Sequence, residues 1–439
     1  MNKISSFPRF VLFFSMAALG FPWPAPAQDL KERLGPAVQA VEPKVIAWRR
    51  DIHQNPELSN RETRTAALVA EHLRKLGLEV RTGVARTGVV GILKGGKPGP
   101  VVALRADMDA LPVTEATGLP FASKVRSTYK GQEVGVMHAC GHDAHTAILM
   151  GVAEVLAGIR KDLPGTVQFF FQPAEEGPPQ GEEGGAKLMV QEGVLDGPGA
   201  PKAIFGLHVG PGLPGNFYYR AGGSMAAADI IRIKVEGRQT HGASPWQGID
   251  PITVAAQIIT ALQTIPSRQL DLTKAPVVVT IGRIQGGVRS NIIPDFVDME
   301  GTLRTLDKGM REEAMRRIRL TAENVAEASG AKATVTFEAV APVTYNDPEL
   351  TRKMLPTLQK IAGPEGVREA PARTGAEDFS YYQEKIPGFF FFLGTSEAGV
   401  NPDTAAPNHS PLFTVNEKTL AAGVRALADL AIDYLNSAR

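Results

Sequence analysis

Four nearly continuous apolar runs punctuate the chain, and polar residues stand at or just beyond the end of each. The runs are PVVALRADMDALP (100–112), TVQFFFQPAEEG (166–177), AIFGLHVG (203–210) and GFFFFLGT (388–395). Continuous apolar runs are typical of strands buried on both faces, and amphipathic segments between them indicate helices. The pattern predicts an α/β fold with a central, mostly parallel sheet and flanking helices, as in dinuclear-metal exopeptidases.

The interval from residue 223 to residue 337 has a different order of elements. Its apolar pattern predicts a strand, a helix, two strands, a helix and a final strand, from ADIIRIKVEG to KATVTFEAV. This β-α-β-β-α-β order is that of a ferredoxin-like α+β unit, complete in itself. We therefore expect a catalytic, metal-binding domain over residues 28–222 and 338–439, and an inserted lid or dimerisation domain over residues 223–337.

The first 27 residues have the pattern of a secretory signal peptide. Lys3 and Arg9 precede the uncharged apolar run VLFFSMAALGF, and the small residues before Gln28 offer a cleavage site. The run is shorter than the roughly 20 apolar residues of a membrane-spanning helix. The sequence predicts a signal peptide over residues 1–27, export to the periplasm or the medium, and no stable membrane anchor after cleavage.

Composition and charge exclude several partners. The formal net charge is +1 and 21% of the residues are charged, which gives no basis for binding nucleic acid. The single cysteine, Cys140, has no partner in its own chain for a disulfide. An exported protein with one free thiol needs another explanation for that thiol.

Cys140 lies in the stretch GVMHACGHDAH (135–145), which also holds three histidines and an aspartate. The following segment, AHTAILMGVAEVLAGIRK, has apolar residues at helical spacing, so this stretch forms the loop that enters a helix. We expect Asp143 to cap the N-terminus of that helix. His138 and His145 are interpreted as packing residues or as residues behind the site.

Metal-binding side chains follow the predicted strands. In open α/β sheets ligands bind beyond the carboxyl ends of the strands, where these residues should converge. The set comprises Asp107, Asp109, Cys140, His142, Glu175, Glu176, His208 and His409. A thiol, imidazoles and carboxylates bind divalent transition metals. The cysteine, the three histidines and one carboxylate of this set make five ligands, more than the three or four of a mononuclear zinc site, which suggests two ions. Singly, each residue also fits a buried cysteine, a core histidine, a solvated acidic loop or a helix cap. No G-x-S-x-G motif supports a serine nucleophile.

The motifs LRADMDALP, MHACGHDAH, FQPAEEG, GLHV, GAEDF and NHS, in this order, resemble the amidohydrolase branch of the aminoacylase and carboxypeptidase metallopeptidases. That branch includes hippurate hydrolases, auxin–amino acid amide hydrolases and N-acyl-amino-acid deacetylases. The resemblance implies five metal ligands, Cys140, His142, Glu176, His208 and His409. It also implies that Glu175 is the general base and that Asp109 orients a ligand histidine.

The resemblance further implies a metal-dependent hydrolase of N-acyl amino acids with two divalent ions, zinc, manganese, cobalt or nickel. In the inserted domain, His241, Asn291 and Arg304 match positions that bind the tetrahedral intermediate and the substrate carboxylate, and relatives form a homodimer through this domain. A dipeptidase or carboxypeptidase of the same family is the nearest alternative. Two others remain: a binding protein that captures ligand without turnover, and a redox sensor built on Cys140.

Overall fold

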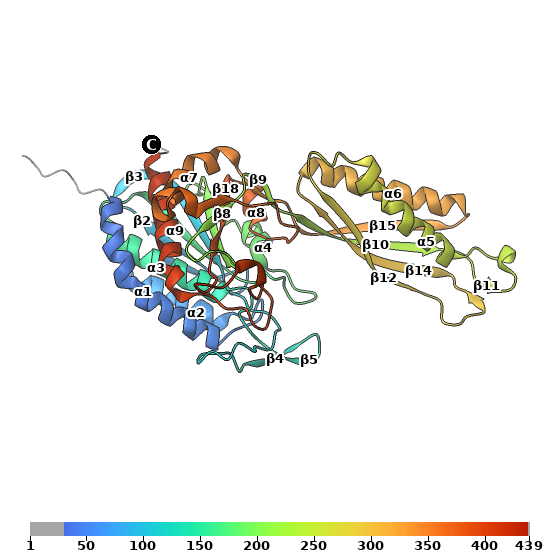
Figure 1. Ribbon diagram of the computed structural model, residues 1–439, viewed down its shortest axis with the longest axis horizontal. Coiled ribbons are helices and arrows are strands. Elements are labelled where there is room, and N and C mark those ends of the chain that lie inside the picture. The colour runs from blue at the N-terminus through green and yellow to red at the C-terminus, as the bar shows by residue number, and fades with distance from the viewer. Residues whose placement is uncertain (1–29, 438–439) are drawn as a thin grey trace, which may run out of the picture.

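The chain folds into two units of unequal size joined by extended strands (Figure 1). The structure, a computed structural model, describes residues 30–437. The predicted signal peptide at residues 1–27 therefore lies outside the described residues. Within residues 30–437 no helix is both long and apolar enough to span a membrane.

The larger unit is built on an eight-stranded sheet with the order β1-β2-β6-β3-β7-β18-β8-β17. These strands are β1 (Glu79–Val84), β2 (Gly88–Lys94), β3 (Lys97–Asp107), β6 (Pro164–Gln172), β7 (Ile204–Gly210), β8 (Phe217–Tyr219), β17 (Val367–Glu369) and β18 (Gly388–Gly394). The four central strands, β6, β3, β7 and β18, run parallel, while β2 and β1 add antiparallel strands at one edge. The four predicted apolar runs are these central strands, which confirms the α/β fold class.

Helices cover both faces of this sheet because alternate side chains of each central strand point to opposite faces. One face packs against α1 (Leu30–Gln54), α2 (Thr63–Lys75), α3 (His142–Gly158), α7 (Pro348–Ala362) and α9 (Leu420–Ser437). The other face packs against the shorter α4 (Gly185–Gln191) and α8 (Ser380–Gln383). Thus Phe169 and Phe171 contribute to one apolar core and Phe170 to the other. The first and last described helices, α1 and α9, lie together on the larger unit (Figure 1).

The smaller unit is a four-stranded antiparallel sheet with two helices on one face (Figure 1). It comprises β10 (Ala227–Glu236), α5 (Pro251–Leu262), β12 (Val277–Gly286), β14 (Phe296–Thr305), α6 (Lys308–Ala328) and β15 (Lys332–Ala341). The sheet order β12-β14-β10-β15 is ferredoxin-like, and the unit has an apolar core of its own. Its first strand begins at Ala227 and its last strand ends at Ala341, and the division of the chain at residues 223 and 337 stays a prediction.

Three small two-stranded sheets complete the fold. They pair β4 (Arg126–Tyr129) with β5 (Gln132–Gly135), β9 (Gly222–Met225) with β16 (Thr344–Asn346), and β11 (Thr240–His241) with β13 (Ile292–Ile293). The β9–β16 pair lies where the chain leaves the larger unit and returns to it. The β11–β13 pair lies at the end of the smaller unit that is remote from the larger one (Figure 1).

The start of α3 differs from the sequence prediction. The N-cap is Gly141, whose φ of 94° is in the left-handed region, and no side chain caps the helix there. Asp143 is instead buried inside the first turn, where its carboxylate lies 2.7 Å from Arg49 Nε and 2.8 Å from His53 Nδ1. The prediction of a capping role for Asp143 is therefore wrong, because the residue holds α1 against α3 as a buried ion pair.

Candidate metal centre

Five side chains from four separate segments meet beyond the carboxyl ends of β6 and β7. Cys140 lies on the loop into α3, His142 is the first residue of that helix, and His208 lies near the end of β7. Glu176 lies on the turn after β6, and His409 lies on the loop that follows β18. The loop of His409 is held in place by a backbone hydrogen bond of 2.7 Å to the Ala139 carbonyl.

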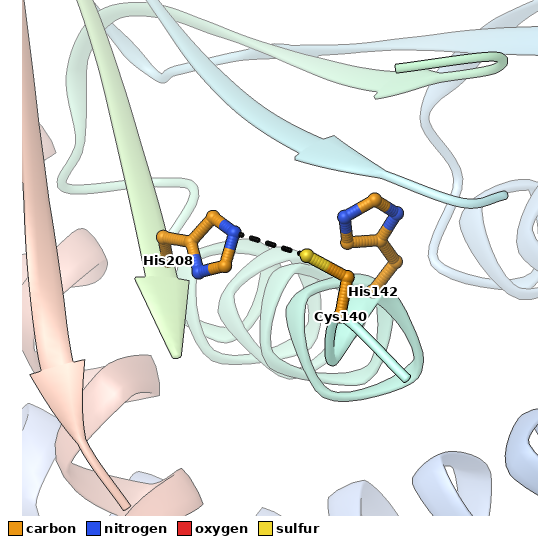
Figure 2. A group of neighbouring side chains, drawn as sticks. All are labelled: Cys140, His142 and His208. Atoms are coloured by element: carbon orange, nitrogen blue, oxygen red, sulfur yellow. Dashed lines mark hydrogen bonds between the residues drawn. The ribbon is translucent and has the colours of Figure 1, made fainter. Parts of the chain in front are cut away.

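The five side chains form two groups that share Cys140. Ligand atoms of Cys140, His142 and His208 lie within 4.8 Å of one another, and so do those of Cys140, Glu176 and His409. Figure 2 shows the Cys140 thiol pointing between two imidazole rings, with Sγ 3.5 Å from His208 Nε2. In the second group, His409 Nε2 lies 3.2 Å from Glu176 Oε1. The five residues identified as ligands by resemblance are thus brought together.

The chemistry of this cluster fits divalent cations. The buried His142 Nε2 has no hydrogen-bond partner among the described residues, although it faces the cluster. Burial and the Glu176 carboxylate raise the pKa of the Cys140 thiol well above its ordinary value. Burial opposes charge on His142, but Asp107 and Asp109 outweigh it and raise the pKa of His142 to about 10. A metal ion offsets the same carboxylate charge and displaces these protons, because ligating thiols and imidazoles are deprotonated.

Asp109 connects two of the candidate ligands. His142 Nδ1 donates to the backbone carbonyl of Asp109 at 2.9 Å and lies 3.2 Å from its Oδ1. Asp109 Oδ2 accepts the backbone N–H of Glu176 at 3.0 Å and the hydroxyl of Ser59 at 2.8 Å. A carboxylate that fixes the far nitrogen of an imidazole determines which nitrogen faces a metal.

The two remaining histidines of the GVMHACGHDAH stretch, His138 and His145, are not among the five candidate metal ligands. His145 uses both ring nitrogens, with Nδ1 2.6 Å from Asp107 Oδ1 and Nε2 accepting the backbone N–H of Val209 at 2.8 Å. His138 is buried, neither of its ring nitrogens has a hydrogen-bond partner within residues 30–437, and burial lowers its pKa to about 3. Because both ring nitrogens of His145 are already bonded within the protein, a supporting role for His145 stays the prediction, and so does a packing role for His138.

Glu175 lies beside the cluster and faces further acidic groups. Its carboxylate oxygens lie within 4.8 Å of those of Glu377 and Asp378, and one lies 3.9 Å from His142 Nε2. Burial and the Glu377 charge raise the pKa of Glu175 well above its ordinary value. The fully buried Arg105 lies 2.9 Å from both Glu377 and Asp378 and so balances part of this charge.

Sequence reasoning assigned no role to several residues that support this site. Glu377 and Asp378 stood in the GAEDF motif, so that motif was the signal for them. Glu62 gave no signal of its own: its buried Oε1 accepts the backbone N–H groups of Asn60 and Ala174 at 3.0 and 2.9 Å. Ala174 directly precedes Glu175 and has a φ of 51°, so Glu62 holds a strained turn that carries the acidic pair.

The predicted substrate-binding residues are divided between two places. A cavity of about 670 Å³ opens over the cluster, and its lining includes Cys140, Glu175, His208 and Arg304. His241 and Asn291 do not line this cavity: both are exposed and belong to the region of the β11–β13 pair at the far end of the smaller unit (Figure 1). Within one chain, only Arg304 of the three reaches the site.

The chain belongs to peptidase family M20/M25/M40, whose model matches residues 103–433. It is 44% identical over 411 residues to thermostable carboxypeptidase 2 of Saccharolobus solfataricus, which covers 93% of this chain and 100% of the relative. It is 38% identical to N-acetyl-L-cysteine deacetylase of Bacillus subtilis, over 95% of both chains. Family membership through the amidohydrolase branch is thereby confirmed, and the chain is a metal-dependent hydrolase that acts on amides.

A solved structure supports the metal content. The YxeP protein of Bacillus subtilis, described as a dinuclear metal-binding peptidase of the M20 family, superimposes with a TM-score of 0.75 at 38% identity. The match covers 91% of this chain and 99% of the YxeP chain. Two divalent ions therefore agree both with this relative and with the two ligand groups that share Cys140.

The predicted export of the protein is corrected by the same relatives. The deacetylase and the carboxypeptidases to which the chain is similar are cytoplasmic enzymes. The export prediction rested on the local pattern of the first 27 residues, and a short apolar run after basic residues need not direct secretion.

Proposed function

We propose that the protein hydrolyses the amide bond of N-acyl amino acids and releases a carboxylic acid and a free amino acid. One observation carries the proposal: Cys140 belongs to two groups of candidate ligands, and a free carboxylate, Glu175, lies beside them. The proposed ligands of two divalent ions are Cys140, His142, Glu176, His208 and His409. The donor set suits zinc, manganese, cobalt or nickel.

Bound divalent metal supplies Lewis acidity, which polarises a carbonyl and lowers the pKa of water. The adjacent acidic residues then have different tasks. Glu176 is assigned to metal binding, whereas Glu175 takes the proton of the attacking water and returns it to the departing amine nitrogen. Buried carboxylates around Glu175 favour this exchange, because they make its protonated form accessible.

The remaining proposed roles concern orientation and substrate binding. Asp109 holds His142 through its Nδ1 and holds the backbone of Glu176, so it positions two ligands. Arg304 contributes a cation to the cavity wall. Since His241 and Asn291 are remote from the cavity of their own chain, we assign them to the site of a second copy in a homodimer.

Two relatives suggest what stands on the acyl side of the scissile amide. Similarity to N-acetyl-L-cysteine deacetylase supports a substrate with a small acyl group on an amino acid. The carboxypeptidase, with higher identity, favours a second candidate function, the removal of a C-terminal amino acid from a peptide. Both reactions cleave an amide next to a free carboxylate, and they differ in whether the other side carries an acyl cap or a free amine.

A substrate panel tests the proposal directly. Metal-loaded protein is given N-acetyl, N-benzoyl and indole-acetyl amino acids together with matched dipeptides, and amine release is measured. We expect the acylated substrates to be favoured, and Glu175→Gln to lower kcat by roughly 10²- to 10⁴-fold with metal content retained. A clear preference for free amino termini indicates the peptidase reaction. If no acylated substrate releases amine while a verified relative is active, the proposal is wrong.

A further inference from the structure

Arg373 lies on the wall of the catalytic cavity and has no role in the assignments above. It lies two residues before the first residue of the GAEDF motif, on a loop between β17 and α8. The cavity lined by Cys140 and His208 is also lined by Arg373 and, from the smaller unit, by Arg304. Two arginines from different units therefore face the same space.

The position of Arg373 is fixed at both its backbone and its side chain. Its backbone N–H donates to the Ser224 carbonyl at 2.9 Å, and its carbonyl accepts the N–H of Ala226 at 3.0 Å. The guanidinium carbon lies 3.7 Å from the centre of the Phe392 ring. Phe392 is in turn 5.7 Å from His208, measured between ring centres. The guanidinium is therefore held one aromatic ring away from a candidate metal ligand.

The charge of Arg373 is not balanced within the chain. Its guanidinium makes no hydrogen bond or ion pair with any residue between 30 and 437, whereas the nearby Arg105 lies within 2.9 Å of Glu377 and Asp378. The side chain is open to the cavity, yet enough protein surrounds it that burial lowers its pKa. Because Arg373 is exposed to the cavity and no acidic side chain pairs with it, its guanidinium can bind an anion that enters the cavity.

We infer that Arg373 binds the α-carboxylate of the amino acid that is released, and so selects substrates with a free carboxylate beside the scissile amide. This inference rests on the proposed function. In an N-acyl amino acid the carboxylate carbon is three bonds, or about 4 Å, from the carbonyl carbon that is attacked. The Arg373 guanidinium is separated from the candidate ligand His208 by the Phe392 ring alone, so a carboxylate at Arg373 and a carbonyl at the metal ligands can belong to one amino acid. The planar guanidinium can pair with both carboxylate oxygens, and its stacking on Phe392 orients it beforehand.

Arg373 and Arg304 differ in which unit of the protein carries them. Arg373 lies on a loop of the larger unit, and its guanidinium stacks on Phe392 of β18, the strand that pairs with β7 and its candidate ligand His208. Arg304 is carried by β14 of the smaller unit, which holds none of the candidate metal ligands. The α-carboxylate is therefore assigned to Arg373.

The test compares an N-acetyl amino acid with its α-carboxamide, which has the same shape and no charge. We expect wild-type protein to prefer the acid in kcat/KM, and Arg373→Ala to reduce this preference by roughly 10- to 100-fold, mainly through KM. Arg373→Lys should retain part of the preference because charge remains without the planar fork. Arg368→Ala, an exposed arginine nearby whose Nε bonds the Glu365 carbonyl, is the matched control and should leave the preference intact.

Binding is measured separately so that the result does not depend on turnover. In a Glu175→Gln background, calorimetry with the N-acetyl amino acid should show weaker binding when Arg373 is also replaced by alanine. Equal losses for acid and carboxamide, or a preference abolished only by Arg304→Ala, would overturn the inference. If wild-type protein cleaves neither substrate, the proposed function fails, and the binding comparison alone then decides whether Arg373 recognises the carboxylate.

Discussion

Cys140 is the residue on which a two-metal centre most depends, because it belongs to both groups of candidate ligands. Replacing it by alanine removes a ligand from each ion, whereas His208→Ala removes a ligand from one group only. We expect Cys140→Ala to lower the bound metal from two ions per chain towards none, and His208→Ala to retain about one. Elemental analysis of dialysed protein provides the measurement.

His145→Asn is the matched control for this experiment. His145 lies near the cluster but its two ring nitrogens are bonded to Asp107 and Val209, so its replacement should change metal content less than either ligand variant does. Retention of both ions by the Cys140→Ala protein would contradict a shared thiolate.

Glu62 should make the stability of the metal-free protein depend on pH. Burial and the Asp109 charge raise its pKa from 4.5 to about 7. Its contribution to the free energy of unfolding is therefore fully present below about pH 4.5 and is lost as pH rises through about 7, by at most about 3 kcal/mol. Glu62→Gln cannot titrate. Urea unfolding at pH 5 and pH 8 should show a larger loss for wild type than for the variant, and equal losses would refute this assignment.

At the scale of residues, the sequence predicts side chains that carry chemistry better than those that support them. The five candidate ligands were identifiable because a thiol, imidazoles and carboxylates stand at strand ends within recognisable motifs. Glu62 and Arg373 could not be identified in this way. Their importance arises from burial, from a strained backbone at Ala174 and from an unbalanced charge, and these depend on residues far apart in the chain.

At the scale of elements, the entry into α3 determines where Cys140 and His142 point. Gly141 separates them with a φ of 94°, and a Cβ at this position would lie 2.4 Å from Cγ2 of the buried Val209. We expect Gly141→Ala to lower the free energy of unfolding by about 2–5 kcal/mol and to weaken metal binding, because backbone strain and a clash add together. Chemical denaturation and metal titration measure the two effects.

Gly118→Ala is the control that separates the cost of backbone strain from the cost of the steric clash with Val209. Gly118 has a φ of 71°, but a Cβ there would meet no atom within 4 Å. The control should therefore cost only about 1–2 kcal/mol and leave metal binding unchanged. A similar cost for both variants would show that contact with Val209 is not what makes Gly141 necessary.

The strands and helices show why the sequence predicts most of the fold but not its details. Continuous apolar runs identified β3, β6, β7 and β18, and the order of elements identified the ferredoxin-like unit. The antiparallel edge strand β1 and the short β8 and β17 lack long runs of this kind. The cap of α3 was mistaken because an aspartate at a helix start usually caps it, whereas Asp143 is needed for a buried ion pair with Arg49.

At the scale of the whole molecule, the smaller unit carries an edge and apolar side chains that a second copy could cover. Strand β12 lies at the edge of its sheet, and its exposed positions include Val278 and Ile284. Trp246 and Val288, near the β11–β13 pair, are 76% and 97% exposed. An unpaired edge with exposed apolar residues favours association, which supports the proposed homodimer.

A dimer in which His241 completes the partner's site can be tested by mixing defects between subunits. Differently tagged chains, one with Glu175→Gln and one with His241→Ala, are co-expressed and the heterodimer is purified. One of its two sites then has both an intact Glu175 and an intact His241 from the other chain, so activity should be about half that of wild type. Each variant alone should be inactive.

The converse heterodimer reverses the expectation and so makes the test decisive. In this heterodimer one chain carries both substitutions and the other is wild type. If His241 acts across the interface, the site with an intact Glu175 is paired with the substituted His241 of the other chain. The intact His241 is then paired with the site that carries Glu175→Gln. This heterodimer should be nearly inactive if His241 acts across the interface. It should be about half active if His241 acts within its own chain. Because His241 lies at the far end of the smaller unit, remote from the cavity of its own chain, we expect the inactive result.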